Sequence, residues 1–296
     1  KEDIPWNETK AVPKEMFFGR DKLIDKLADH YLSKNRIETY VLFGLTRHGK
    51  SSIHKYLSEN LFLKEINTDY GIKKILPFFW SFATASSQDN ARDMWSSFLD
   101  DCILEGTEND PGLEVYIDRG QIPDILSKNE KLSIIQSRPQ KRNTYFMKIL
   151  SEINKMGYFP FIAIDEFSFY KQMVDKGLVE PSFLQQIREL TIDSEQASFI
   201  FAGVYDLIDM LKDPQYGITS QLANTIELQI GPIDENESAK LIDVSKKINF
   251  TKEANQYIRE ISNNIPFFIQ MICRRCGWYA QATGRDLIGI PEIEKI

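Results

Sequence analysis

The sequence has few of the features that mark secreted, fibrous or membrane-spanning proteins. Its 296 residues include only three cysteines, too few to hold a secreted domain together with disulfides. The 15 glycines and 12 prolines are too few for a collagenous or low-complexity chain. The longest nearly apolar stretches, Ile75–Ala83 and Tyr158–Ile164, are well short of the roughly 18 residues that a membrane-spanning helix needs. We therefore expect a soluble, cytoplasmic protein with no membrane partner.

Basic residues are also in the minority. The chain has 43 acidic and 36 basic side chains, a net charge of −7, which argues against nucleic acid as a partner of the whole surface. It opens with Lys1 rather than methionine, which indicates a fragment or a processed product. The length suggests one large domain or two modest ones.

Short apolar runs alternate with helical stretches, the pattern of an α/β protein with a mostly parallel sheet flanked by helices. Nearly continuous apolar runs are typical of strands that are buried on both faces. We expect five strands, at Thr39–Phe43, Ile75–Phe82, Phe159–Ile164, Ala197–Gly203 and Thr225–Gln229. Helices are expected at Lys50–Phe62, Ala91–Leu104, Lys141–Met156, Pro181–Thr191 and Tyr205–Leu211.

The character of the chain changes after Gly231-Pro232. Helices are predicted at Glu235–Lys246, at Thr251–Ile261 with Thr251 as N-cap, and at Phe267–Ala282 after the helix-breaking Pro266. This tail has no convincing strand. We divide the chain into a core domain, residues 1–233, and a small helical subdomain, residues 234–296. Within the core, we interpret Glu105–Arg138, rich in Gly, Pro and acidic residues, as an insertion with a short helix near Ile122–Ser127.

The most specific motif is Gly44-Leu45-Thr46-Arg47-His48-Gly49-Lys50-Ser51, which matches the P-loop pattern G-x-x-x-x-G-K-[ST]. It lies between a predicted strand and a predicted helix, as the pattern requires. The two glycines let successive backbone N–H groups point at phosphate oxygens. Lys50 can reach the β- and γ-phosphates, and the Ser51 hydroxyl can ligate Mg²⁺. The predicted nucleotide-binding residues of this loop are Gly44, Thr46, Arg47, His48, Gly49, Lys50, Ser51 and Ser52.

A second motif is the apolar strand Phe161–Ile164 that ends in Asp165-Glu166. In a parallel sheet, this places both carboxylates at the edge where ligands bind. We expect Asp165 to hold Mg²⁺ and Glu166 to act as the general base on the attacking water, with Lys50 as the other catalytic residue. A glutamate directly after the aspartate favours hydrolysis over binding alone. By contrast, Cys273 and Cys276 form a single C-x-x-C inside a predicted helix, which favours core packing over a zinc site.

With Phe18-Gly19-Arg20 ahead of the P-loop and Asn264-Ile265-Pro266 after the last strand, the sequence resembles a STAND-type P-loop ATPase, of the AAA+-related archaeal-type ATPase group. The resemblance covers residues 17–295, except the insertion. It implies that Phe18, Gly19 and Arg20 frame the base and ribose and that Pro266, at the start of a lid helix, lies near the nucleotide. In the family a glycine stands where this chain has Asn264. A winged helix usually follows the lid, so the resemblance implies a missing C-terminal part.

Two further departures from the family concern catalysis. Relatives have a polar γ-phosphate sensor after the strand that here ends at Gly203, where this chain continues with Val204, Tyr205 and Asp206. Tyr205 or Asp206 could substitute for the sensor, but we interpret them as packing or helix-cap residues. Relatives often have an arginine in the loop that corresponds to Pro214–Ala223, and this loop contains none. We therefore expect hydrolysis to be slow or dependent on a partner.

The resemblance implies an ATP/ADP-dependent signalling switch that self-associates in its ATP state and works with sensor and effector domains outside this sequence, in relatives often in antiviral defence. Two alternatives remain open. One is a DNA-associated AAA+ ATPase of the origin-binding or transposition-helper kind, against which the acidic charge counts. The other is a nucleotide-binding scaffold that no longer hydrolyses ATP, against which Glu166 counts.

Overall fold

The computed structural model describes residues 4–6, 16–33, 39–68, 71–82, 128–180, 182–193, 196–213, 216 and 225–296. The chain forms two compact units. The sheet unit comprises Leu27–Phe43 and His54–Gln229, and the helical unit comprises Lys1–Lys26, Gly44–Ile53 and Ile230–Ile296. The helical unit therefore combines three separate stretches of chain. The division into domains at residue 233 stays a prediction.

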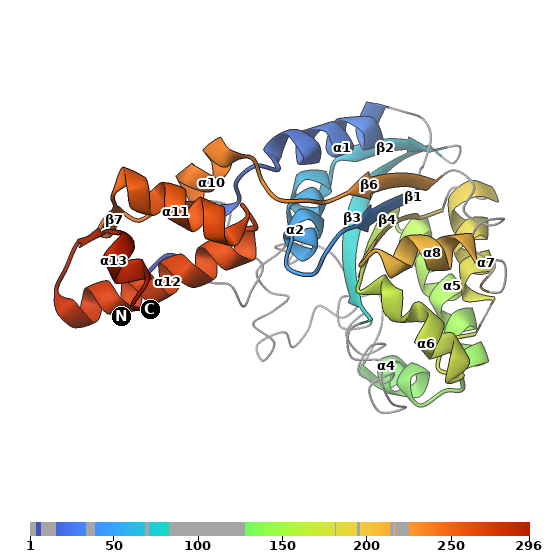
Figure 1. Ribbon diagram of the computed structural model, residues 1–296. Helices are drawn as coiled ribbons and strands as arrows, with labels where there is room; N and C mark the ends of the chain where they lie inside the picture. Colours follow the sequence, from blue (N-terminus) through green and yellow to red (C-terminus); the bar gives the residue numbers. More distant parts are fainter. Residues whose placement is uncertain are drawn as a thin grey trace. The chain divides into compact units, whose positions relative to one another are not determined.

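The sheet unit contains a six-stranded sheet with the order β2-β3-β4-β5-β1-β6 (Figure 1). Neighbouring strands are parallel from β3 to β6, and β2 pairs with β3 antiparallel. The strands are β1 Thr39–Phe43, β2 Glu65–Thr68, β3 Gly71–Ser81, β4 Tyr158–Asp165, β5 Ser198–Gly203 and β6 Thr225–Gln229. The α/β fold class and the five predicted strands are confirmed. The predicted total of five was wrong, because it omits β2.

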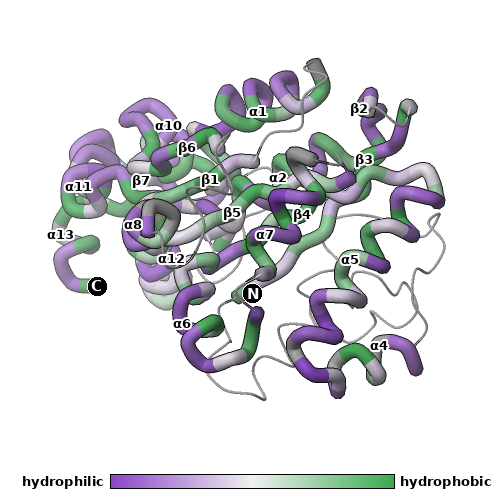
Figure 2. Tube along the Cα trace, turned by 90° about the vertical axis from the view of Figure 1, so that its right-hand side faces the viewer, coloured by the Kyte–Doolittle hydropathy of each residue, from purple (hydrophilic) through white to green (hydrophobic). Residues whose placement is uncertain are grey.

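Side chains alternate between the two faces of the sheet, and helices cover both faces. On one face, Tyr31 of α1 (Asp21–Ser33) packs against Tyr40 and Phe161, with ring centroids 5.5 and 5.2 Å apart. On the other face, Ile162 belongs to a large cluster of buried hydrophobic residues. Helices α1 and α5 (Pro139–Lys155) alternate hydrophobic and hydrophilic residues, as expected for helices with one face on a sheet (Figure 2).

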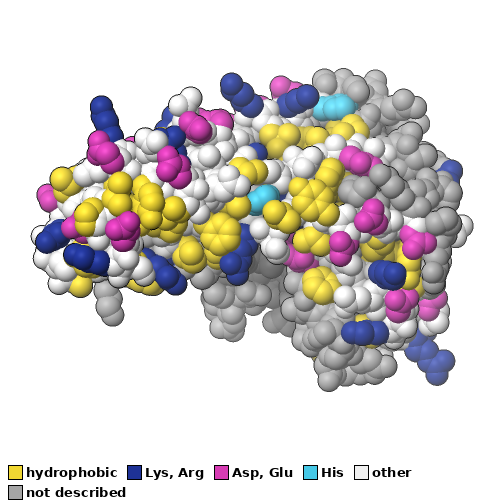
Figure 3. Space-filling view, in the orientation of Figure 1, with side chains coloured by type: hydrophobic (Ala, Val, Ile, Leu, Met, Phe, Trp, Pro, Cys, Tyr) yellow, Lys and Arg dark blue, Asp and Glu magenta, His cyan; other side chains and the backbone are white. Residues whose placement is uncertain are grey.

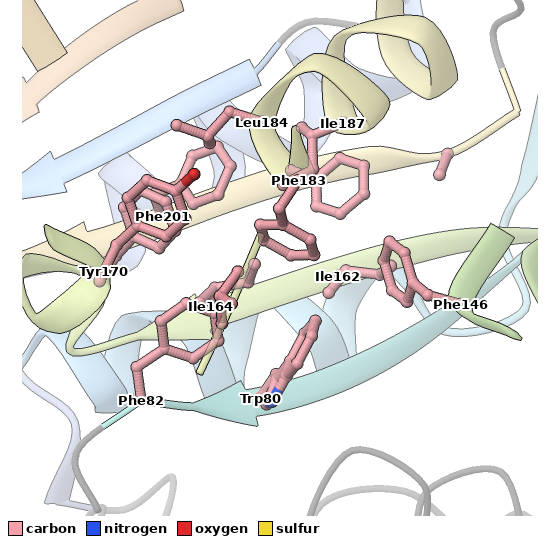
Figure 4. Close-up of a cluster of buried hydrophobic side chains, with 14 of the residues drawn as sticks. Trp80, Phe82, Phe146, Ile162, Ile164, Tyr170, Phe183, Leu184, Ile187 and Phe201 are labelled. Atoms are coloured by element: carbon pink, nitrogen blue, oxygen red, sulfur yellow. The ribbon is translucent and has the colours of Figure 1, made fainter. Parts of the chain in front are cut away.

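Aromatic rings pack against one another within this cluster (Figure 4). Trp80 on β3 lies 5.6 Å from Phe146 on α5 and 5.7 Å from Phe183 on α7 (Phe183–Arg188), measured between ring centroids. Phe167, in the short 3-10 helix η3 (Phe167–Phe169), lies 4.4 Å from Phe201 on β5. Because Phe167 is fully buried, this core fixes the chain directly after Asp165.

The remaining helices of the sheet unit are α2 Lys50–Leu61, which begins in the helical unit, α4 Lys128–Ile135, α6 Tyr170–Asp175, α7, the π-helical turn η4 Glu189–Asp193, and α8 Asp206–Lys212. Of these, α2, α7 and α8 differ from the predictions mainly at their ends, whereas α4 and α6 were not predicted. The helix expected at Ala91–Leu104, and Ile122–Ser127 within the expected insertion, lie outside the described residues. The insertion's last part, residues 128–138, contains α4 and leads into α5.

The helical unit contains α10 Glu235–Ile242, α11 Lys252–Ser262, α12 Pro266–Thr283 and α13 Ile290–Ile293. Thr251 caps α11 as predicted, since its side chain accepts a hydrogen bond from the Ala254 N–H at 3.1 Å. The expectation of a tail without strands was wrong. The two-residue strands β7 Asn249–Phe250 and β8 Leu287–Ile288 form a small parallel sheet, and such short pairs leave no local signal in a sequence.

Residues from the beginning of the chain complete this unit. Trp6 is buried, and its Nε1–H donates to the Leu241 carbonyl of α10 at 2.9 Å. The Trp6 ring meets Phe250 edge-on, with centroids 5.9 Å apart. Among the described residues, five large hydrophobic side chains of the unit are exposed: Leu45, Ile261, Trp278, Leu287 and Ile296. Figure 3 shows hydrophobic groups among charged ones on this surface. No helix within the described residues is both long and apolar enough to cross a membrane.

Candidate functional site

The P-loop curls around a buried ammonium group. It follows β1 and leads directly into α2, whose first residue is Lys50. The Lys50 side chain is 6% exposed, and its Nζ donates to the carbonyl oxygens of Gly44 and Leu45, each at 3.0 Å. The loop therefore places a positive charge and the N-terminus of a helix together, and both favour an anion.

The two motif glycines serve different purposes. A Cβ atom on Gly44 would lie 2.2 Å from the Ile230 carbonyl oxygen, so this position requires close approach of two backbones. Gly49 has open space around it, but its φ of +88° is a conformation that L-residues rarely adopt. The loop thus needs its first glycine for space and its second for backbone conformation.

The other predicted residues of the loop divide between exposed and buried positions. Thr46 and Ser51 are exposed, whereas Ser52 is buried in the first turn of α2. His48 is buried, and its Nδ1 lies 3.0 Å from the Ile230 carbonyl oxygen. Because a carbonyl only accepts, Nδ1 must carry the proton. The variable motif position of His48 favoured a solvent-facing or a nucleotide-adjacent role; its burial contradicts the first, and the second stays a prediction.

Arg47 is the most unusual residue of the loop. Its φ is 72°, in the left-handed region, although it is not a glycine. Its guanidinium lies 4.1 Å from the centroid of the Phe267 ring, within the range of a cation–π contact. The sequence did not predict that Phe267 or the Ile230 carbonyl contacts the P-loop.

The Phe18–Arg20 box lies against the segment that leads into α10. Phe18 is half-buried, and Gly19 packs so closely on Ile233 that an added Cβ would be 3.0 Å from its side chain. The Arg20 guanidinium donates to the Gly231 carbonyl. Burial lowers the pKa of Arg20, and the nearby Asp234 carboxylate partly offsets this. The helical unit therefore brings the box and the P-loop against one short segment, residues 230–233.

Pro266 is the first residue of α12 and half-buried. The two residues before Ile265, Asn263 and Asn264, have φ of 51° and 55°. The Asn264 carbonyl accepts a hydrogen bond from the Ile233 N–H at 3.1 Å. Asparagine is, after glycine, the residue that best tolerates this left-handed conformation. Asn264 thus has a backbone conformation that is typical of glycine.

The acidic pair ends β4 in the sheet unit. Asp165 is 6% exposed, and its Oδ1 accepts a hydrogen bond from the Glu166 N–H at 2.9 Å. Glu166 has a φ of 54°, which costs on the order of 1–3 kcal/mol for a residue with a side chain. The buried Phe167 that follows it anchors this turn in the aromatic core. The strained position is therefore held by packing, as is common at functional sites.

The carboxyl end of β5 is tied to the same turn. The Val204 N–H donates to Ser168 Oγ at 3.0 Å, a link that the sequence did not predict. Tyr205 packs edge-on against Phe43, at 5.8 Å between centroids, and its hydroxyl accepts from Gln229 Nε2 at 3.0 Å. Asp206 lies in the first turn of α8. The packing of Tyr205 agrees with its interpretation. The helix-cap interpretation of Asp206 is wrong, because Asp206 is the first residue of α8 and no side chain caps this helix start. The loop expected to lack a catalytic arginine lies, except for Tyr216, outside the described residues.

Cys273 and Cys276 are both fully buried in α12, which confirms the prediction of core packing. Burial raises the pKa of Cys276 to about 12 and that of Cys273 well above its usual range. The described part of the chain contains no group of three or more His, Cys, Asp or Glu side chains placed to hold a metal ion.

The chain matches no family model, and no curated protein matches it in sequence. Among the solved structures that are similar over nearly all of it are the following three. A Walker-type ATPase of Pyrococcus abyssi shares 15% identity with a TM-score of 0.63, covering 94% of this chain and 72% of its own. The Aeropyrum pernix ORC1 protein in complex with DNA shares 12% identity with a TM-score of 0.58, and the match covers 97% of this chain and 68% of that one. The Aeropyrum pernix ORC2 protein in its ADP form shares 12% identity with a TM-score of 0.59, and the match covers 98% of this chain and 70% of that one. Because the sequence identities are so low, these similarities show the fold alone: the chain has a P-loop NTPase fold.

Proposed function

We propose that this chain binds ATP and ADP with Mg²⁺ and hydrolyses ATP slowly. The observation that carries the proposal is the P-loop curled around the buried Lys50 ammonium at the N-terminus of α2. This arrangement favours the phosphate groups of a nucleotide over any uncharged ligand. The structural likeness to a Walker-type ATPase and to a protein in its ADP form supports adenine nucleotides.

Each predicted residue has a role in this proposal. Lys50 and the loop from Gly44 to Ser52 bind the phosphates, and Phe18, Gly19, Arg20 and Pro266 frame the base and ribose. Ser51 and Asp165 supply the metal ligands, and their hydroxyl and carboxylate oxygens are of the type that Mg²⁺ prefers. When bound, Mg²⁺ neutralises phosphate charge. Glu166 takes the proton of the attacking water, on a backbone fixed by Phe167.

The biological setting that we propose is a STAND-type signalling switch, which self-associates with ATP bound and is released by slow hydrolysis. The motifs Phe18–Arg20, Asp165-Glu166 and Asn264–Pro266 support it. Asn264 does so because its left-handed φ fits the position of the family's glycine. A role in antiviral defence belongs to the same proposal. Sensor and effector domains outside this sequence would act as partners.

A second candidate is a DNA-associated ATPase. One observation favours it: a similar structure is that of an ORC1 protein in complex with DNA. The net charge of −7 counts against it, because DNA binding draws its affinity from basic side chains at phosphates. Fluorescence anisotropy with duplex DNA, at low and at physiological salt, separates the two. Submicromolar binding at physiological salt would favour the DNA-associated function.

Nucleotide binding is tested by titration calorimetry with ATP, ADP and GTP in the presence of Mg²⁺. We expect ATP and ADP to bind and Lys50→Ala to abolish binding. Lys55→Ala is the matched control, because Lys55 lies on the same helix and is also 6% exposed. Equal affinity for GTP would overturn the adenine assignment, and unchanged ATP affinity in Lys50→Ala would overturn the site.

Hydrolysis is tested separately by single-turnover kinetics of Glu166→Gln. This variant keeps the shape of the side chain and removes its basicity. It should retain ATP binding and hydrolyse about 10²-fold more slowly. If the variant is as fast as an active wild type, Glu166 is not the general base. If wild type and variant are equally inactive, the chain is a nucleotide-binding scaffold.

A further inference from the structure

The P-loop is anchored to its own unit on two sides. On one side, Gly44 and His48 both contact the Ile230 carbonyl. On the other side, the Arg47 guanidinium lies over the Phe267 ring, on the second residue of α12. The first anchor is a buried carbonyl that Gly44 and the His48 ring contact, whereas the second joins an exposed cation to a half-buried ring.

Arg47 needs this second anchor more than an ordinary loop residue does. Its φ of 72° is disfavoured for a residue with a side chain, so the loop conformation at this point must be held by contacts. Its long side chain also has many rotamers and gains order only from what it touches. A cation that is already ordered binds an anion at a lower entropic cost than a mobile one.

We propose that Phe267 is a positioning residue for the phosphate-binding loop, which it serves by holding the Arg47 guanidinium on its ring face. The inference rests on the proposed nucleotide-binding function and adds a coupling to it. Because Phe267 directly follows Pro266, the same contact links the loop to the start of α12. By reciprocity, a nucleotide that orders Arg47 strengthens the docking of α12 by the same factor that α12 contributes to nucleotide affinity.

The competing explanation is that Phe267 only fills space at the start of α12. Phe268 provides the matched control, because it is the next residue, is also half-buried, and meets Phe267 edge-on at 5.5 Å between centroids. A packing role predicts similar effects when either ring is removed. A cation–π role predicts an effect at Phe267 alone, and rescue by any aromatic ring with an equal or stronger π face.

The test measures ADP affinity with Mg²⁺ by titration calorimetry on the whole chain. Phe267→Leu should weaken binding by about two- to fivefold, the range of an exposed cation–π contact. Phe267→Trp should bind ADP at least as tightly as the wild type does. Phe268→Leu should bind ADP with the affinity of the wild type. Arg47→Gln should weaken binding, and adding Phe267→Leu to it should cause no further loss, because the two residues act as one unit.

Amide hydrogen exchange without nucleotide gives an independent reading. The loop amides of residues 45–49 should exchange faster in Phe267→Leu than in the wild type. In Phe268→Leu they should exchange at the wild-type rate. Additive losses in the double variant, or equal effects at both phenylalanines in affinity and exchange, would overturn the inference. Failure of the proposed function looks different, since ADP would then not bind the wild type or would bind Lys50→Ala equally well. The exchange measurement decides the positioning role even in that case.

Discussion

Adding a side chain at either P-loop glycine should lower the stability of the folded chain, for a different reason at each position. In Gly44→Ala, the new Cβ would lie 2.2 Å from the Ile230 carbonyl oxygen and 3.1 Å from its carbon. Relief requires a backbone shift of about 1 Å, and overpacking of this kind costs about 1–3 kcal/mol. The same shift strains the His48–Ile230 hydrogen bond, worth about another 1 kcal/mol. In Gly49→Ala nothing lies within 4 Å, so the cost is that of the left-handed backbone, about 1–2 kcal/mol.

Asparagine separates the two causes. Gly49→Asn should be less destabilising than Gly49→Ala, because asparagine tolerates a positive φ, while Gly44→Asn should be worse than Gly44→Ala, because it is larger. Differential scanning calorimetry measures the loss, at about 2–4 °C in Tm per kcal/mol. The reasoning is refuted if Gly44→Ala is as stable as the wild type within about 0.5 kcal/mol, below the overpacking range, or if asparagine brings no relief at position 49.

Three further predictions concern the helical unit. Asn264→Gly should keep its stability while Asn264→Val loses about 1–2 kcal/mol, because a β-branched residue resists a φ of 55°, as urea unfolding would show. Trp6→Phe should cost about 1–3 kcal/mol by leaving the Leu241 carbonyl without its donor, and Trp6→Ala about 3–5 kcal/mol in the same assay. Cys273 and Cys276 should resist a thiol reagent at pH 8 until the chain is unfolded. Since folding raises both pKa values, stability should fall as pH rises from about 9 toward 12, and pH-dependent unfolding checks this.

Much of the sheet could be predicted because its strands carry their own signal. The bounds of β1 and β6 agree with the prediction residue by residue. The apolar run of β1 ends at Gly44, and β6 alternates polar and apolar residues. The strand β2 was missed because only Ile66 of its four residues is buried. Its pairing with β3 depends on a partner strand and not on its own composition. The same holds for β7 and β8, whose partners are far apart in the sequence.

The candidate site divides in the same way. The P-loop and Asp165-Glu166 were visible because their chemistry demands particular side chains at fixed spacing. What the sequence did not reveal were contacts made by backbone groups or by residues of ordinary type, such as the Ile230 carbonyl, the Phe267 ring and the Ser168 hydroxyl. Any residue offers a carbonyl, and phenylalanine is common, so neither has a motif. Only the folded chain shows which of them lies beside the loop.

The burial of Trp6 also has a consequence for synthesis. Trp6 and the carbonyl that it binds are 235 residues apart in the chain. At about 5–20 residues per second, the ribosome needs roughly 10–50 s to make that stretch. During this time the sheet unit, which ends at Gln229, can fold, while the tryptophan waits without its binding pocket. The helical unit, and with it the P-loop's anchor at Ile230, therefore forms last. During this delay the Trp6 indole lacks its hydrogen-bond acceptor and its packing partner Phe250, and it is the group that a chaperone has most to protect.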